Sequence, residues 1–192
     1  KVGICFQHAG DQLFGPSVLD DVAFGPLNQG LNRNEAYQIA LQQLERLNIV
    51  RLKDRSVNTL SGGEQNFTAL AGVLAMQPKV LLLDEPLGAL DLKLRRQMQL
   101  ELKRLQKQLG ITFIYITHDQ EEAINMSDRI GVMHEGILEQ LGTPNEVYYQ
   151  PQTSYVADFV GNANILHKNG ETFAIRSENI LMNGEAVCTQ EA

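Results

Sequence analysis

Apolar and polar residues follow one another in blocks along the chain, and these blocks predict strands interleaved with helices. Three short apolar runs are typical of buried strands, namely "VGICF" (2–6), "KVLLLDEP" (79–86) and "ITFIYITHD" (111–119). The second and third runs end in polar residues, which are therefore expected at the carboxyl ends of their strands. Because helical patterns lie between these strands, the fold class is predicted to be α/β.

Three segments repeat their apolar residues with the helical period. The first covers residues 34–49, the second follows the capping residue Ser61, and the third covers residues 91–109 and stops at Gly110. The apolar stripes that these helices would bury are Ala36, Ala40, Leu44 and Leu47; Leu70, Val73 and Leu74; and Leu94, Met98, Leu102, Leu105 and Leu109.

The remaining segments are predicted from turn residues. Residues 7–32 are rich in Gly, Pro, Asn and Asp, so they are expected to form a loop with short turns. After a short helix at 120–126, a hairpin is expected to turn at Glu135-Gly136, and two short helices follow. Beyond about Gly161, short strands around "KNGE" and "NGEA" predict the start of a small β domain.

Composition narrows the class of protein. The 192 residues are 43% hydrophobic, which suits one globular domain or one domain with a piece of another. A formal net charge of -7 disfavours a nucleic-acid partner. No apolar run approaches the roughly 20 residues that span a bilayer. The first residue is Lys1 and the first run reads as the middle of a strand, so we expect a fragment.

Polar residues at the predicted strand ends can act on a phosphoryl group. Of Asp84 and Glu85, one could hold Mg²⁺ and the other could orient a water molecule for attack. His118 would reach the same edge if the two strands are neighbours, and there it could contact a γ-phosphate. The Gln7 amide could ligate Mg²⁺ or position water. The alternative for each residue is an ordinary solvated side chain at a strand end.

"LSGGEQ" (60–65) predicts an anion site at the start of a helix. The first turn of a helix has unpaired N–H groups and a partial positive charge. Ser61 adds a hydroxyl, and Gly62 and Gly63 have no side chain to keep a phosphate away. The alternative is an N-capped helix with a flexible entrance. In "LGALD" (87–91), a glycine permits a turn and Asp91 can cap the next helix.

In this order, the motifs "LSGGEQ", "LLLDEP", "LGALD" and "ITHD", with Gln7 before them, resemble the nucleotide-binding subunit of ABC transporters over about residues 1–160. The resemblance implies a P-loop NTPase-like core in residues 1–160, with a helical subdomain at about 15–75 and without the N-terminal P-loop segment. It also implies that residues 161–192 are the truncated start of a TOBE-like β domain.

The resemblance also implies roles for single residues. Gln7 matches the Q-loop glutamine, Asp84 the Walker B acid, Glu85 the general base, Asp91 the D-loop and His118 the switch histidine. The signature motif, which would bind nucleotide, comprises Ser61, Gly62, Gly63, Glu64 and Gln65. Gln7 and Asp84 are the expected metal ligands.

Cofactors and partners follow from the same resemblance. ATP and Mg²⁺ are the implied cofactors, and a second ATPase subunit is expected to complete a head-to-tail dimer. Transmembrane permease subunits would bind the dimer at the cytoplasmic face of the membrane. An extracytoplasmic solute-binding protein or a substrate-capture subunit would take part indirectly.

Two parts of the chain resemble different importers. Residues 78–166 and the tail "FAIRSENILM" look like the ATPase of spermidine/putrescine importers, which favours a polyamine-like solute. Residues 6–31 and "ALAGVLAMQP" look like the ATPases of cobalt, nickel or vitamin energy-coupling importers. Two further alternatives are a catalytically incompetent interaction module and a soluble ABC-type ATPase of DNA repair or translation, which the acidic charge disfavours.

The sequence departs from the family pattern at two places. It contains no G-x-x-x-x-G-K-[ST], and none of its lysines follows a glycine. The phosphate-gripping loop is expected before Lys1, and without it the chain should bind β- and γ-phosphates weakly. After "LSGGEQ" the family usually continues with a polar residue and then Arg, whereas Asn66 and Phe67 stand here.

Overall fold

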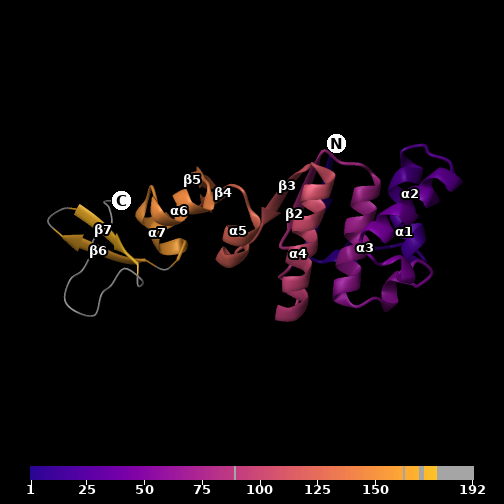
Figure 1. The fold of residues 1–192 in the computed structure, drawn as a ribbon, viewed down its shortest axis with the longest axis horizontal. Helices are drawn as coiled ribbons and strands as arrows, with labels where there is room; N and C mark the ends of the chain where they lie inside the picture. Colours follow the sequence, from indigo (N-terminus) through magenta and orange to yellow (C-terminus); the bar gives the residue numbers. More distant parts are fainter. Residues whose placement is uncertain (89, 162, 169–170, 177–192) are drawn as a thin grey trace. The chain divides into compact units, whose positions relative to one another are not determined.

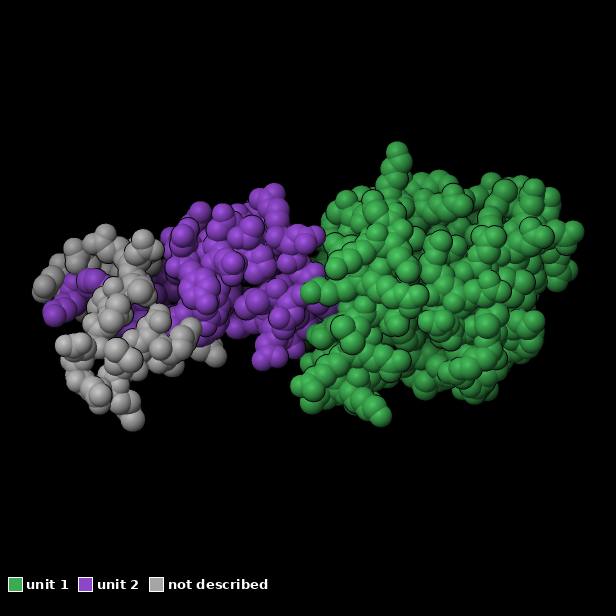
Figure 2. Space-filling model, in the orientation of Figure 1, with its two compact units in different colours: residues 1–118 green, residues 119–192 purple. Residues whose placement is uncertain are grey.

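The computed structural model describes residues 1–88, 90–161, 163–168 and 171–176. The chain divides into two compact units, residues 1–118 and 119–192, shown in green and purple in Figure 2. The predicted strands around "NGEA" (183–186) lie outside the described residues. The predicted domain boundary at residue 160 stays a prediction.

A parallel sheet lies in the first unit and confirms the predicted α/β class. Its strands are β1 (Val2–Cys5), β2 (Val80–Asp84) and β3 (Thr112–Ile116), in the order β1-β2-β3. Cys5 pairs with Leu83, and Asp84 pairs with Ile116. Because all three strands run in the same direction, their carboxyl ends meet at one edge, where ligands bind in such sheets.

The prediction that β3 is buried is wrong. Ile114 is 44% exposed and Ile116 is 47% exposed. The strand lies at the end of the described sheet. Val2 and Ile4 of β1, which are in register with Thr112 and Ile114 through β2, are exposed as well. The apolar run therefore predicts the strand correctly, but the burial of its side chains depends on which elements pack on each face of the sheet.

The three predicted helices are confirmed as α2 (Arg33–Arg46), α3 (Gly62–Ala75) and α4 (Leu92–Leu109). Gly110 ends α4 in the left-handed conformation at φ 61°. The stripe residues that are buried are Ala36, Ala40, Leu44, Leu47, Leu70, Val73, Leu74, Met98, Leu102 and Leu105. Leu94 and Leu109 are half-buried.

The loop predicted over residues 7–32 is wrong in its second half, which forms the helix α1 (Val18–Asn28). Ser17 caps it, and α1 packs against both α2 and α3 (Figure 1). Gly25 makes room for this packing, because a Cβ there would lie 2.5 Å from Cγ of Met76. Packing therefore outweighs the turn-like composition. The side chains that α1 buries are Val18, Asp21, Val22, Ala23 and Pro26.

Three short 3-10 segments join these elements, namely η1 (Ala9–Gln12), η2 (Val50–Leu52) and η3 (Val57–Thr59). The segment around η2 supports the start of α1. Val18 N donates to Arg55 O and Leu19 N donates to Lys53 O, each at 2.9 Å. Two of the N–H groups that a helix start leaves unpaired are thereby satisfied.

The second unit contains the predicted short helices and hairpin. Its elements are α5 (Gln120–Met126), β4 (Ile130–His134), β5 (Ile137–Gly142), α6 (Pro144–Tyr149), α7 (Ser154–Phe159), β6 (Asn164–Lys168) and β7 (Glu171–Ile175). β4 and β5 pair across Glu135 and Gly136, both at positive φ, as predicted. Arg176 follows β7 and donates to the backbone oxygens of Tyr148 and Val160.

None of the helices in the described part of the chain combines the length and the apolar character needed to cross a membrane.

Candidate functional site

The aligned strand ends bring together three residues that are far apart in the sequence. Gln7 Nε2 donates a hydrogen bond to Glu85 Oε2 at 2.5 Å, although the two residues are 78 positions apart. Nδ1 of His118 lies 2.9 Å from Glu85 Oε1 across a separation of 33 positions. Both carboxylate oxygens of Glu85 thus have a side-chain neighbour from another strand end. Gln7, Glu85 and His118 are called the Glu85 cluster below.

Glu85 has an unusual backbone conformation. Its φ is 41°, in the left-handed region that non-glycine residues adopt at a cost of about 1 kcal/mol. Its N–H donates to Ile116 O at 2.9 Å, and its carbonyl accepts from Gly88 N at 3.1 Å. These bonds hold the turn that aims the carboxylate at the other strand ends. Strained residues held in this way often occur at functional sites.

Gln12 supports the segment that carries Gln7. Its Nε2 donates to Ile4 O at 3.1 Å, and its Oε1 accepts from Phe6 N at 3.3 Å. The side chain therefore continues the hydrogen bonding of β1 beyond its end and fixes where Gln7 begins. The sequence alone does not point to Gln12, because a glutamine within a Gly- and Pro-rich segment gives no local signal.

The histidine and the glutamate of the Glu85 cluster differ in access to solvent. The His118 side chain is 76% exposed and that of Glu85 is 25% exposed. Asp84 ends β2 and is half-buried. His118 can therefore meet a ligand from solvent while it contacts the more sheltered Glu85 carboxylate.

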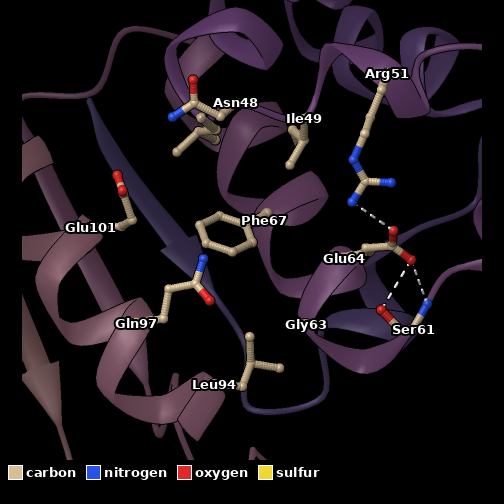
Figure 3. A pocket seen from close by; sticks show the side chains of 11 residues that line it. Asn48, Ile49, Arg51, Ser61, Gly63, Glu64, Phe67, Leu94, Gln97 and Glu101 are labelled. Carbon is tan, nitrogen blue, oxygen red and sulfur yellow. Dashed lines mark hydrogen bonds and ion pairs between the residues drawn. The ribbon is translucent and has the colours of Figure 1, made fainter.

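The start of α3 is the second predicted part of the site. Ser61 is its N-cap residue, and the Glu64 carboxylate reaches back to accept from both Ser61 N and Ser61 Oγ at 3.0 Å. Arg51 contacts the other oxygen of Glu64 at 3.1 Å and Arg55 lies at 3.7 Å (Figure 3 shows Arg51). The backbone N–H of Ser61, its hydroxyl and the two arginines together hold the pKa of Glu64 below its usual value.

The two glycines of this motif have different surroundings. A Cβ at Gly62 would meet nothing within 4 Å, whereas one at Gly63 would lie 2.6 Å from Cδ2 of Leu94. Gly62 therefore leaves its backbone open to solvent. Gly63 instead lets the first turn of α4 pack against α3. The predicted open approach for a phosphate stays a prediction for both glycines, which differ in the space beside their Cα atoms.

Gln65 and Asp91 lie at other contacts. The Gln65 side chain lies against Gly10, where Oε1 is 3.1 Å from the position that a Cβ would take. The Asp91 carboxylate accepts from Leu94 N at 2.9 Å and caps α4, as predicted. The structure therefore gives Asp91 the capping role, and it directs the Gln65 side chain toward η1.

A pocket of about 320 Å³ lies beside the start of α3 (Figure 3). Phe67 is 9% exposed and forms part of its wall with Leu94 and Gln97 of α4. Phe67 thus packs as an apolar residue between α3 and α4 at the position where the family usually has Arg.

The strand ends carry donor groups of the chemical type that magnesium takes. Among the described residues, no group of three or more His, Cys, Asp or Glu side chains gathers as a metal site. Mg²⁺ commonly takes one or two carboxylates and completes its shell with water and substrate phosphates. The Asp84 carboxylate and the Gln7 amide oxygen are donors of this type, so they could hold Mg²⁺ together with a bound nucleotide.

Comparisons with known proteins agree with these motifs. Residues 1–88 match the family model described as "ABC transporter". The uncharacterized ABC transporter ATP-binding protein YdcT of Escherichia coli is 47% identical over 175 residues, which cover 87% of this chain and 52% of YdcT. The spermidine/putrescine import ATP-binding protein PotA of Bacillus cereus is 48% identical over 181 residues, covering 93% of this chain and 54% of PotA.

Solved structures of ABC transporter proteins are similar to this chain as well. The chain is similar to cbiO1 from Clostridium perfringens, described as part of the ABC transporter complex cbiONQ, with a TM-score of 0.71 and 42% identity over 76% of this chain and 58% of cbiO1. A putative metal-chelate type ABC transporter at 24% identity and a TM-score of 0.71 shares the fold. The chain spans about half the length of the curated relatives it matches. In sequence and in fold, the chain is therefore similar to ABC transporter ATP-binding proteins.

Proposed function

We propose that the chain is part of an ATP-hydrolysing subunit of an ABC importer, peripheral on the cytoplasmic face of the membrane. The Glu85 cluster carries this proposal. It combines a sheltered carboxylate, an exposed histidine and an amide at the carboxyl ends of neighbouring parallel strands. ABC relatives and the fold support the same class of activity.

In the proposed reaction, a water oxygen attacks the γ-phosphorus of ATP as the bond from this phosphorus to the bridging oxygen of ADP breaks. Glu85 orients the attacking water through a hydrogen bond and accepts its proton as the new phosphorus–oxygen bond forms. His118 contacts the γ-phosphate, which its exposed ring can reach. Asp84 and Gln7 would hold Mg²⁺, which neutralises phosphate charge when bound.

The start of α3 is proposed to serve a second subunit. In a head-to-tail dimer, Ser61 and the backbone at Gly62 would meet the γ-phosphate of ATP held by the other copy. The open space at Gly62 and the unpaired N–H groups of the first turn support this proposal. The Ser61 hydroxyl now donates to Glu64, so it would exchange this acceptor for a phosphate oxygen.

A permease subunit is the proposed membrane partner of the α1 region. A pocket of about 310 Å³ lies between α1 and α3, and Phe14 and Phe24 are among the residues that line it. Their rings meet edge to face at a centroid distance of 4.5 Å, and their side chains are 63% and 45% exposed. An apolar helix end of a permease could cover this pair.

A polyamine-like solute is favoured. Relatives named for spermidine/putrescine import match 78% to 93% of this chain at 46% to 53% identity. The likeness to cbiO1 supports the alternative of a cobalt, nickel or vitamin importer of the energy-coupling type. Uptake of labelled putrescine and of labelled cobalt by cells with and without the gene would separate the two.

Phosphate release from Mg-ATP tests the activity. In the natural protein that contains these residues, Glu85→Gln is expected to lower kcat by about 100-fold or more, because Gln cannot act as a base toward water. Glu45→Gln changes an exposed residue of α2 and is the matched control. The 192 residues alone are expected to bind ATP weakly and to turn over negligibly. Turnover that survives Glu85→Gln would contradict the role proposed for Glu85, and absence of turnover in the unaltered protein would support the interaction-module alternative.

A further inference from the structure

The side chain of Asn66 connects α3 with the turn that carries Glu85. Asn66 Nδ2 donates a hydrogen bond to the backbone oxygen of Pro86 at 3.3 Å, in a partly buried position. Asn66 directly follows the motif at the start of α3, and Pro86 directly follows Glu85. One amide therefore bridges the segment proposed to face the other subunit's nucleotide and the segment proposed to act on the chain's own nucleotide.

The turn that begins at Glu85 contains an unfavourable backbone conformation that contacts with other elements must stabilise. Glu85 is in the unfavourable left-handed region at φ 41°. Within the turn, Gly88 N donates to Glu85 O at 3.1 Å and Leu90 N donates to Leu87 O at 3.2 Å. Neither of these bonds uses the Pro86 carbonyl, which instead accepts from Asn66. The peptide that follows Pro86 is therefore tied to α3, and Glu85 is the residue directly before Pro86.

A second contact joins the same two segments. Leu94, in the first turn of α4, occupies the space beside Gly63 that a Cβ would need. Phe67, the residue after Asn66, is also buried at this boundary and lines the pocket between α3 and α4. The segment from Glu85 to Leu94 thus contacts α3 near both of its ends, and Asn66 supplies the contact nearest to Glu85.

We propose that Asn66 is a positioning residue for Glu85, which couples the start of α3 to the orientation of the Glu85 carboxylate. The proposal rests on the proposed ATP hydrolysis, in which Asn66 touches neither nucleotide nor water. Asn66 acts through a single hydrogen-bond donor. A side chain that keeps an N–H donor within hydrogen-bond distance of Pro86 O should therefore keep Glu85 in position. A shift of α3 upon contact with the second subunit's nucleotide would be transmitted to the turn through this bond.

The test compares Asn66→Asp, which has the same shape but an oxygen in place of the donor, with Asn66→Gln, which keeps the amide. In the natural protein, Asn66→Asp is expected to lower kcat for ATP about five- to tenfold with KM nearly unchanged, and Asn66→Gln should restore most of the rate. Thr59→Val removes a similar side-chain bond to a backbone oxygen, from Thr59 Oγ1 to Ser56 O, and is the control.

Hydrogen exchange of the Gly88 and Leu90 amides provides a readout besides activity. Faster exchange in Asn66→Asp, but not in Thr59→Val, together with the lower kcat, would support the proposal. Unchanged exchange, or faster exchange with an unchanged kcat, would overturn it. Should the unaltered protein and Glu85→Gln both fail to hydrolyse ATP, the proposed function fails, whereas the link between α3 and the turn is still decided by the exchange rates.

Discussion

The two parts of the candidate site are built in different ways. The start of α3 comes from contiguous residues, 61–65, and its hydrogen bonds join Ser61 to Glu64 within a single helical turn. The Glu85 cluster comes from three strand ends, with bonds that span 78 and 33 positions. A local motif depends on helix capping, whereas an assembled cluster depends on the register of a whole sheet. Substitutions should therefore have local effects in the first part and long-range effects in the second.

Removal of His118 should have the largest effect after loss of Glu85. His118→Ala deletes the group proposed to contact the γ-phosphate and leaves Glu85 Oε1 without its neighbour, so ATP turnover is expected to fall about 100-fold. His134→Ala is the matched control, since His134 also lies beside a glutamate, Glu139, at 3.6 Å. Equal losses in the two variants, measured as phosphate release, would contradict the assembled cluster.

Substitutions of Gly62 and Gly63 should have intermediate effects on stability, and the two effects should differ in sign. Gly63→Ala should lower the free energy of unfolding by about 1 kcal/mol, because the new methyl group meets Leu94. Gly62→Ala should leave it unchanged or raise it, since space is open there and Ala favours a helix. Thermal unfolding of both variants measures the difference. Equal shifts in melting temperature would show that the first turn of α4 does not pack on Gly63 as described.

Substitution of Glu64 should have the smallest effect on stability, and this effect should depend on pH. Its pKa is lower in the folded protein than the ordinary value of 4.5, so its contribution to stability is present above about that pH and is lost as the pH falls through the folded pKa. Unfolding followed between pH 6 and pH 3 should therefore show a smaller loss of stability in Glu64→Gln than in the unaltered protein. Arg51→Ala should cost less than about 1 kcal/mol, because the Arg51 side chain is 66% exposed. Parallel pH profiles of Glu64→Gln and the unaltered protein would contradict the contacts of Glu64.

Prediction from the sequence worked where a pattern was periodic or contiguous. The stripe of α2, the cap at Ser61 and the stop of α4 at Gly110 follow from helical spacing and backbone preference. It failed at α1, where Gly25 and Pro26 suggested a loop although neighbouring helices provide a surface to bury. It failed again at β3, where an apolar strand is exposed on one face.

The sequence by itself determined the motifs, the order of the three parallel strands and of the helices α2, α3 and α4, and the residue types that suit phosphate chemistry, because these depend on short-range spacing and side-chain character. Tertiary structure alone decided that Gln7 and His118 meet on the two oxygens of Glu85, that Gly63 makes room for Leu94, and that Asn66 reaches Pro86. These contacts depend on strand register and helix packing. Each joins segments that are far apart along the chain, so their closeness in space cannot be read from the sequence.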